Sequence, residues 1–174
     1  MRTRQNMHDT RSALQRGVTV RGFTLIELVV TVAIIGILVS VAVPFAELTV
    51  KRAKEQELRL ALRQIRTGLD DYKKAADEGR VQKKADESGY PPSLTLLVEG
   101  VKDARKANEE TKIYFMRRIP RDPFNADAEL TAADTWGKRS YKSPPDQPAE
   151  GDDVFDVYSL SEAVGINGVP YKEW

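Results

Sequence analysis

Residues 21–40 read RGFTLIELVVTVAIIGILVS, an apolar run that carries one carboxylate, Glu27, near its start. From Leu28 to Ala46 there are 19 consecutive residues without a charge. As an α-helix they span about 28 Å, which is close to the thickness of the hydrocarbon core of a bilayer. A core helix of a soluble protein normally keeps a polar stripe, and this run has only Thr31 and Ser40. The sequence therefore predicts a membrane-spanning helix.

The flank of this run predicts its orientation. Five arginines and one acidic residue, Asp9, precede Phe23. Positive flanks stay in the cytoplasm, so the C-terminal part of the chain should be exported. A cleaved secretory signal peptide is the alternative, because Ser40-Val41-Ala42 resembles a small-x-small cleavage site. Glu27 counts against this alternative, since a disposable signal has no reason to carry a charge that is costly in lipid.

The composition excludes several classes of function. Lysine and arginine total 27 against 26 acidic residues, so no basic face for nucleic acid is expected. The chain has no cysteine, which excludes disulfides, thiolate nucleophiles and thiolate metal sites. Its single histidine, His8, lies in the polar N-terminal tail, so a Ser/His/Asp triad has no histidine in the folded part. We therefore predict no catalytic residues and no enzyme activity.

Beyond the apolar run, the spacing predicts that the helix continues as an amphipathic segment to a stop at Gly79. Six residues spaced four and three apart form one apolar stripe: Leu58, Leu62, Ile65, Leu69, Tyr72 and Ala76. Three acid-before-base pairs four residues apart suit an exposed face: Glu47 with Lys51, Glu55 with Arg59, and Asp70 with Lys74. A lone amphipathic helix cannot bury its stripe, so the rest of the chain should pack on it. A free coiled coil is the alternative, but barely three heptads are present.

The C-terminal part mixes short elements with loops. We expect a short helix over residues 94–98 capped by Ser93, and strands within residues 136–142 and 154–159. Asn167-Gly168 predicts a tight turn. The remaining segments read as a polar loop (82–89), a charged, mobile stretch (102–112), an extended turn enforced by two prolines (119–124) and an exposed connection (143–153).

The stretch Gly22-Phe23-Thr24-Leu25-Ile26-Glu27 resembles the prepilin cleavage and methylation motif of type IV pilins and type II secretion pseudopilins. The shared features are a basic leader that ends in glycine, an aromatic residue next, a glutamate fifth after the cut, and an apolar helix. Pro44 also stands where these families commonly have a proline that bends the helix. The resemblance implies cleavage between Gly22 and Phe23 by prepilin peptidase, and methylation of the new Phe23 amine. The mature chain would have 152 residues, with 22 basic and 25 acidic side chains.

The resemblance gives Glu27 a role in assembly. In a filament its carboxylate would pair with the Phe23 amine of a neighbouring subunit and set the helix register, because a buried charge is tolerated when it is paired. The alternative is that Glu27 pairs with the Phe23 amine of its own chain only. Pro44 and Gly36 would loosen or bend the helix during packing, although ordinary tolerance of Gly and Pro in membrane helices explains both equally well.

Later segments extend the likeness to the major pseudopilins of the type II secretion system, the protein G type. They are Tyr90-Pro91, Ile119-Pro120-Arg121-Asp122-Pro123-Phe124, Phe155-Asp156-Val157-Tyr158-Ser159 and the terminal Trp174. The resemblance implies an α+β, pilin-like fold, in which a long N-terminal helix packs on a small C-terminal antiparallel sheet with loops. The expected regions are a cytoplasmic leader that is removed (1–22), a transmembrane and assembly helix (23–46), its amphipathic continuation (47–80) and a periplasmic globular region (81–174).

Calcium is the one cofactor that the resemblance raises. Major pseudopilins often bind this ion in an acidic loop after the final strand, but residues 160–165 hold a single acid, Glu162. Calcium prefers six to eight oxygen ligands, several of them carboxylates. Asp152, Asp153 and Asp156 could contribute, although such clusters are usually solvated. We expect no cofactor and assign no metal ligand.

The implied function is a structural subunit of the periplasmic pseudopilus that drives protein secretion across the outer membrane. Its expected partners are further copies of itself, minor pseudopilins, prepilin peptidase, the inner-membrane secretion platform and membrane lipid. It would be a single-pass inner-membrane protein with a cytoplasmic N-terminus. Two alternatives remain open: a type IV pilin or minor pilin for adhesion, motility or DNA uptake, and a membrane-anchored periplasmic enzyme or binding domain.

Overall fold

A computed structural model describes residues 22–106 and 111–174 of the chain. The arginines that predict the orientation of the apolar run all precede residue 22, so that prediction lies outside the described residues. Contacts divide the chain into two compact units, Met1–Val43 and Pro44–Trp174. One helix, α1 (Leu25–Asp77), belongs to both units, and the other helices and strands that the structure describes lie in the second.

The end of α1 follows from a glycine. Gly79 has a φ of 70°, in the left-handed region that glycine adopts at little cost. Its N–H donates to the Ala76 carbonyl at 2.9 Å. The next N–H, that of Arg80, donates to the Ala75 carbonyl at 2.8 Å. These two bonds define a Schellman motif, which satisfies the last carbonyls of the helix. The predicted stop at Gly79 is confirmed.

The core of the second unit forms along one face of α1. All six residues of the predicted stripe are buried, so that prediction is confirmed. Eight buried residues from the rest of the unit pack in the same cluster: Val81, Leu94, Leu97, Ala133, Trp136, Val154, Val157 and Tyr171. Because the removal of apolar area from water is the main force in folding, this stripe organises the unit. The chain covers its own amphipathic helix, as expected, and the helix is not a free coiled coil.

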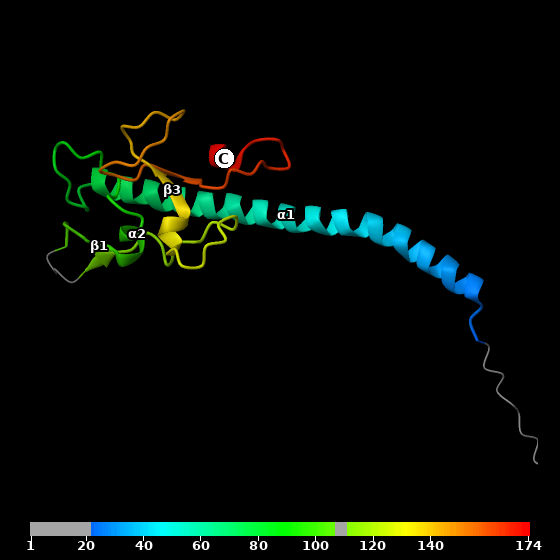
Figure 1. The fold of residues 1–174 in the computed structure, drawn as a ribbon. Coiled ribbons are helices and arrows are strands. Elements are labelled where there is room, and N and C mark those ends of the chain that lie inside the picture. The colour runs from blue at the N-terminus through cyan, green and yellow to red at the C-terminus, as the bar shows by residue number, and fades with distance from the viewer. Residues whose placement is uncertain (1–21, 107–110) are drawn as a thin grey trace, which may run out of the picture. The chain divides into compact units, whose positions relative to one another are not determined.

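Two small antiparallel sheets accompany α1 (Figure 1). The first pairs β1 (Val101–Lys102) with β2 (Lys112–Ile113), and the second pairs β3 (Trp136–Arg139) with β4 (Asp156–Ser159). Gly137 of β3 lies opposite Tyr158 of β4, and a Cβ added at Gly137 would lie 2.4 Å from the tyrosine ring. This close approach requires glycine. The α+β, pilin-like fold is confirmed, with two sheets in place of the expected one.

The predicted strands are confirmed but shorter, and two details differ. Helix α2 (Leu96–Glu99) begins after Thr95, and the Ser93 hydroxyl lies 2.8 Å from the Thr95 hydroxyl instead of capping the helix. The predicted capping residue was therefore wrong. The two ends of the charged stretch 102–112 belong to antiparallel strands, in which Lys102 pairs with Lys112.

The proline-containing segment Ile119–Phe124 is fixed by a buried carboxylate. Asp122 accepts hydrogen bonds from the Ser159 hydroxyl of β4 and, at 2.8 Å, from the Phe124 N–H. Its own N–H donates to Thr135 Oγ1 at 3.2 Å. A buried charge is tolerated when it is hydrogen-bonded, so Asp122 ties the turn to the second sheet. The two prolines predicted the turn but not this attachment.

The three predicted acid–base pairs on α1 do not form among the described residues. Lys51 instead donates to the Val164 carbonyl at 2.8 Å, and the guanidinium of Arg59 lies 4.4 Å from the centroid of the Trp174 ring. Glu55 is buried. These side chains turn toward the C-terminal segment because it packs along the helix, and a pattern within one helix does not contain that information.

Candidate assembly surface

The predicted processing residues lie at the start of α1. Gly22 and Phe23 precede the helix and are exposed. Thr24 caps it, because its hydroxyl oxygen accepts a hydrogen bond from the Glu27 N–H at 3.3 Å. Glu27 is exposed in the first turn, where the helix dipole favours a negative charge. Within residues 22–106 and 111–174 its carboxylate has no hydrogen-bond or ion-pair partner.

The apolar half of α1 is exposed along its whole length. Its most apolar 18-residue window has a mean hydropathy of 2.7, and none of that window is buried. Leu25, Ile26 and Ile37 are 82%, 71% and 68% exposed. The two hydroxyls in the run bond within the helix, Thr31 to the Leu28 carbonyl and Ser40 to the Ile37 carbonyl. A continuous apolar surface of this kind marks contact with a membrane or with other chains. The helix is long and apolar enough to cross a membrane.

Pro44 lies inside α1, and the boundary between the two units falls directly before it. Proline has no N–H, so the helical hydrogen bond to the carbonyl of Ser40 is missing. One turn further on, the Thr49 hydroxyl donates to the Phe45 carbonyl at 2.9 Å. The missing hydrogen bond weakens the helix locally, and the bend at Pro44 stays a prediction.

A buried carboxylate on α1 holds the C-terminal segment. Oε1 of Glu55 accepts hydrogen bonds from the Ile166 N–H at 2.7 Å and from the Tyr171 hydroxyl at 3.0 Å. Burial, together with this hydrogen bond and the neighbouring negative charge, raises the pKa of Tyr171 to about 12. The predicted tight turn is confirmed between these contacts, where the Gly168 N–H donates to the Gly165 carbonyl at 3.0 Å.

The sequence assigned Glu55 to the exposed face, and that was wrong. The spacing of the buried stripe could have predicted its burial, because Glu55 lies three residues before Leu58 and so continues the alternation of four and three.

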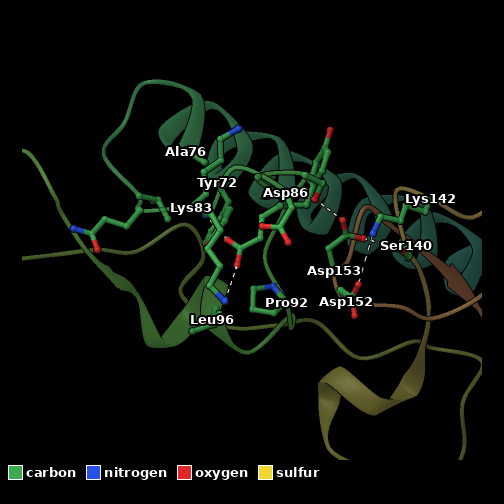
Figure 2. Close-up of a pocket in the computed structure, with 17 residues that line it drawn as sticks. Tyr72, Ala76, Lys83, Asp86, Pro92, Leu96, Ser140, Lys142, Asp152 and Asp153 are labelled. Atoms are coloured by element: carbon green, nitrogen blue, oxygen red, sulfur yellow. Dashed lines mark hydrogen bonds and ion pairs between the residues drawn. The ribbon is translucent and has the colours of Figure 1, made fainter.

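A polar cavity of about 450 Å³ lies beside the C-terminal end of α1, and Figure 2 shows its lining. Asp153 accepts hydrogen bonds there from the hydroxyls of Ser88 and Ser140 and from the Tyr141 N–H. Burial works to raise the pKa of Asp153, but these bonds outweigh it and hold the pKa below its ordinary value. A general base at neutral pH needs a pKa near 7, so this carboxylate is unsuited to that role.

The acids considered for calcium do not converge. Asp153 is held by the hydroxyls just described, and Asp156 pairs with Arg66 at 2.8 Å. Asp152 is exposed and lies 3.8 Å from Lys142 (Figure 2). In the part of the chain that the structure describes, no group of three or more His, Cys, Asp or Glu residues is placed to hold a metal ion.

These features define a class of protein: a pilin-like chain anchored in a membrane by an N-terminal helix. The family model for the prokaryotic N-terminal methylation motif matches residues 18–43. That range contains Gly22, Phe23 and Glu27.

Similar proteins narrow the class. The type II secretion system core protein G of Klebsiella pneumoniae is 30% identical over 139 residues, which cover 77% of this chain and 91% of that protein. The core protein G of Vibrio cholerae is 31% identical over 146 residues, covering 80% of this chain and 78% of that protein. The chain belongs to the type II secretion system core protein G family. No solved structure gives a significant match.

A type IV pilin matches over a shorter region. The type IV major pilin protein PilA of Myxococcus xanthus is 39% identical, but only over 72 residues, which cover 41% of this chain and 32% of that protein. The matches to core protein G cover about twice as much of the chain, so the likeness to type IV pilins is the weaker of the two.

Proposed function

We propose that this chain is the structural pseudopilin subunit that polymerises through its N-terminal helix into the periplasmic pseudopilus of a type II secretion system. Growth of that filament would drive protein secretion across the outer membrane. The observation that carries the proposal is the apolar half of α1, which is wholly exposed and bears Glu27 in its first turn. A lone chain leaves this surface uncovered, whereas stacked copies would bury it.

Processing would create a positively charged partner for the carboxylate of Glu27. Cleavage between Gly22 and Phe23 leaves an amine at Phe23, which would then be methylated. On assembly, the carboxylate of Glu27 would pair with the Phe23 amine of the adjoining subunit. Removing one partner of a buried ion pair typically costs about 3–5 kcal/mol, so the pair would select one register over all others. Pro44 would let the helix bend or loosen as it packs.

The proposed regions follow the processing site. Residues 1–22 would be a cytoplasmic leader, 23–46 the transmembrane and assembly helix, 47–80 its amphipathic continuation, and 81–174 the periplasmic globular region. Before assembly the subunit would wait in the inner membrane with its N-terminus in the cytoplasm. Its partners would be further copies of the chain, minor pseudopilins, prepilin peptidase and the inner-membrane platform. The subunit would perform no chemistry and need no cofactor.

Three measurements test the proposal: the mass of the mature N-terminus, filament formation and secretion. Mass spectrometry of the chain purified from its native membrane should show a mature protein that begins at methylated Phe23. A mature N-terminus at Val43 would mean that the apolar segment is discarded, and the proposal would then be wrong. Expression together with the secretion platform should give filaments that contain the chain, and its deletion should abolish secretion. Loss of surface motility or adhesion with secretion intact would favour a type IV pilin.

A further inference from the structure

The second unit carries an open apolar groove where α1 meets the C-terminal segment. Eight residues line the groove: Ala46, Glu47, Val50, Lys51 and Lys54 of α1, with Phe124, Ala163 and Tyr171 from the rest of the unit. Its volume is about 440 Å³.

Two aromatic rings in this apolar groove are held by contacts within the unit. The rings of Phe124 and Tyr171 stack with centroids 4.0 Å apart, and Tyr171 is held by its hydrogen bond to Glu55. Val50 is 58% exposed at the edge. A preformed apolar floor with exposed edges gains by being covered.

The same stretch of α1 carries a complementary surface on its other side. Phe45 and Leu48 are 67% and 45% exposed and form an apolar ridge with Arg52. At about 100° per residue, the centre of this ridge lies roughly 160° around the helix from the centre of the groove wall. One helix thus presents an apolar ridge on one face and an apolar groove on the opposite face.

The groove and the ridge also carry opposite charges. Glu47 lines the groove and is exposed, and Arg52 is exposed on the ridge. Neither has an ion-pair partner among the described residues, whereas the nearby ammonium of Lys51 is taken up by the Val164 carbonyl. A ridge that enters the groove of another copy would therefore bring an arginine toward a glutamate, and complementary charges fix the register of a contact.

We propose that the apolar ridge of one copy docks in the apolar groove of the next, with Arg52 of the first facing Glu47 of the second. The two surfaces differ, so the contact is head-to-tail and can repeat from copy to copy along a filament. It would continue the assembly surface of the apolar half of α1 into the second unit, because the groove wall begins at Ala46, the last residue of the uncharged run. The inference rests on the proposed function and adds the residues that pack outside the lipid.

Disulfide cross-linking tests the contact, since the chain has no cysteine of its own. In the full chain expressed with its secretion platform, Leu48→Cys combined with Ala163→Cys should give a ladder of covalent oligomers on mild oxidation. Each single variant can give at most a dimer. The matched control combines Ala163→Cys with Leu60→Cys, because Leu60 is apolar and 55% exposed but lies about 120° around the helix from Leu48. The control pair should give no ladder, because a disulfide needs Cα atoms within about 7 Å.

Charge exchange supplies a second readout. Arg52→Glu and Glu47→Arg alone should each reduce filament yield by about fivefold, as for an exposed ion pair worth up to about 1 kcal/mol. The two changes together should restore the yield. Absence of a ladder from the Leu48–Ala163 pair would overturn the proposed contact, and this is the result expected if lipid fills the groove instead. Absence of recovery in the exchanged variant would overturn it as well. Absence of filaments from the unmodified chain would instead count against the proposed function.

Discussion

The two halves of α1 use the same kind of side chain for different purposes. In the first half, leucines, isoleucines and valines are exposed around the whole helix, and Leu38 is 63% exposed. In the second half most of the large apolar residues lie on one buried stripe, where Leu58, Ile65 and Leu69 are 0% exposed. The difference shows that this chain buries only part of its apolar surface by folding. The remainder is available to a membrane or to other chains.

The largest effect on filament assembly is expected from a change at Glu27, the charged residue of the exposed half. Glu27→Ala should abolish incorporation into filaments, because the Phe23 amine would be buried without a partner at a cost of about 3 kcal/mol or more. The measurement is the amount of the variant in filaments isolated from cells that also express the secretion platform. Glu57→Ala, an exposed acid of the second half, is the matched control and should assemble normally. Equal incorporation of the Glu27 variant would remove its role in register.

Truncation in the buried half should affect folding instead. Leu69→Ala should lower the free energy of unfolding by about 2–5 kcal/mol, since it leaves a cavity in the core. Leu38→Ala in the exposed half should leave the denaturation of the second unit unchanged in detergent. Denaturant titration followed by tryptophan fluorescence measures both, because Trp136 lies in the core. If both variants were destabilised equally, the two halves would not be distinct.

A smaller loss is expected at the contact between α1 and the C-terminal segment. Glu55→Ala leaves the Ile166 N–H and the Tyr171 hydroxyl without their acceptor, which should cost about 2–3 kcal/mol. Hydrogen exchange should accelerate in residues 163–174 and much less in β3 and β4. Unchanged exchange in the C-terminal segment would mean that its packing on α1 does not depend on this carboxylate.

The smallest effect is expected at alkaline pH. The pKa of Tyr171 is raised to about 12 in the folded protein and is about 10 in an unfolded chain. The folded state therefore retains this proton more strongly, so the contribution to stability is complete below pH 10 and is lost as the pH rises toward 12. Difference absorbance of tyrosinate between the parent chain and Tyr171→Phe should show one group that ionises late. Ionisation of that group near pH 10 would contradict the buried contact with Glu55.

Much of the fold could be predicted because it depends on local patterns. The buried stripe, the stop at Gly79, the two main strands and the Asn-Gly turn each follow from a few neighbouring residues. The burial of Asp122 could not be predicted in the same way, and the spacing that places Glu55 on the buried stripe does not reveal its partners. Among the described residues, Glu55 accepts hydrogen bonds only from residues more than 100 positions away, and Asp122 accepts one from Ser159, 37 positions away, so a local pattern of acids and bases cannot specify these partners.

By itself, the sequence determined that this chain has an N-terminal methylation motif, an apolar helix and an amphipathic continuation. A motif and the spacing of apolar residues can both be read from residues that are close together in the chain. Only the tertiary structure decided which charges are buried and where a groove forms beside the helix. Those outcomes depend on the packing of the C-terminal segment against α1, where hydrogen-bond partners and apolar contacts come from distant parts of the chain.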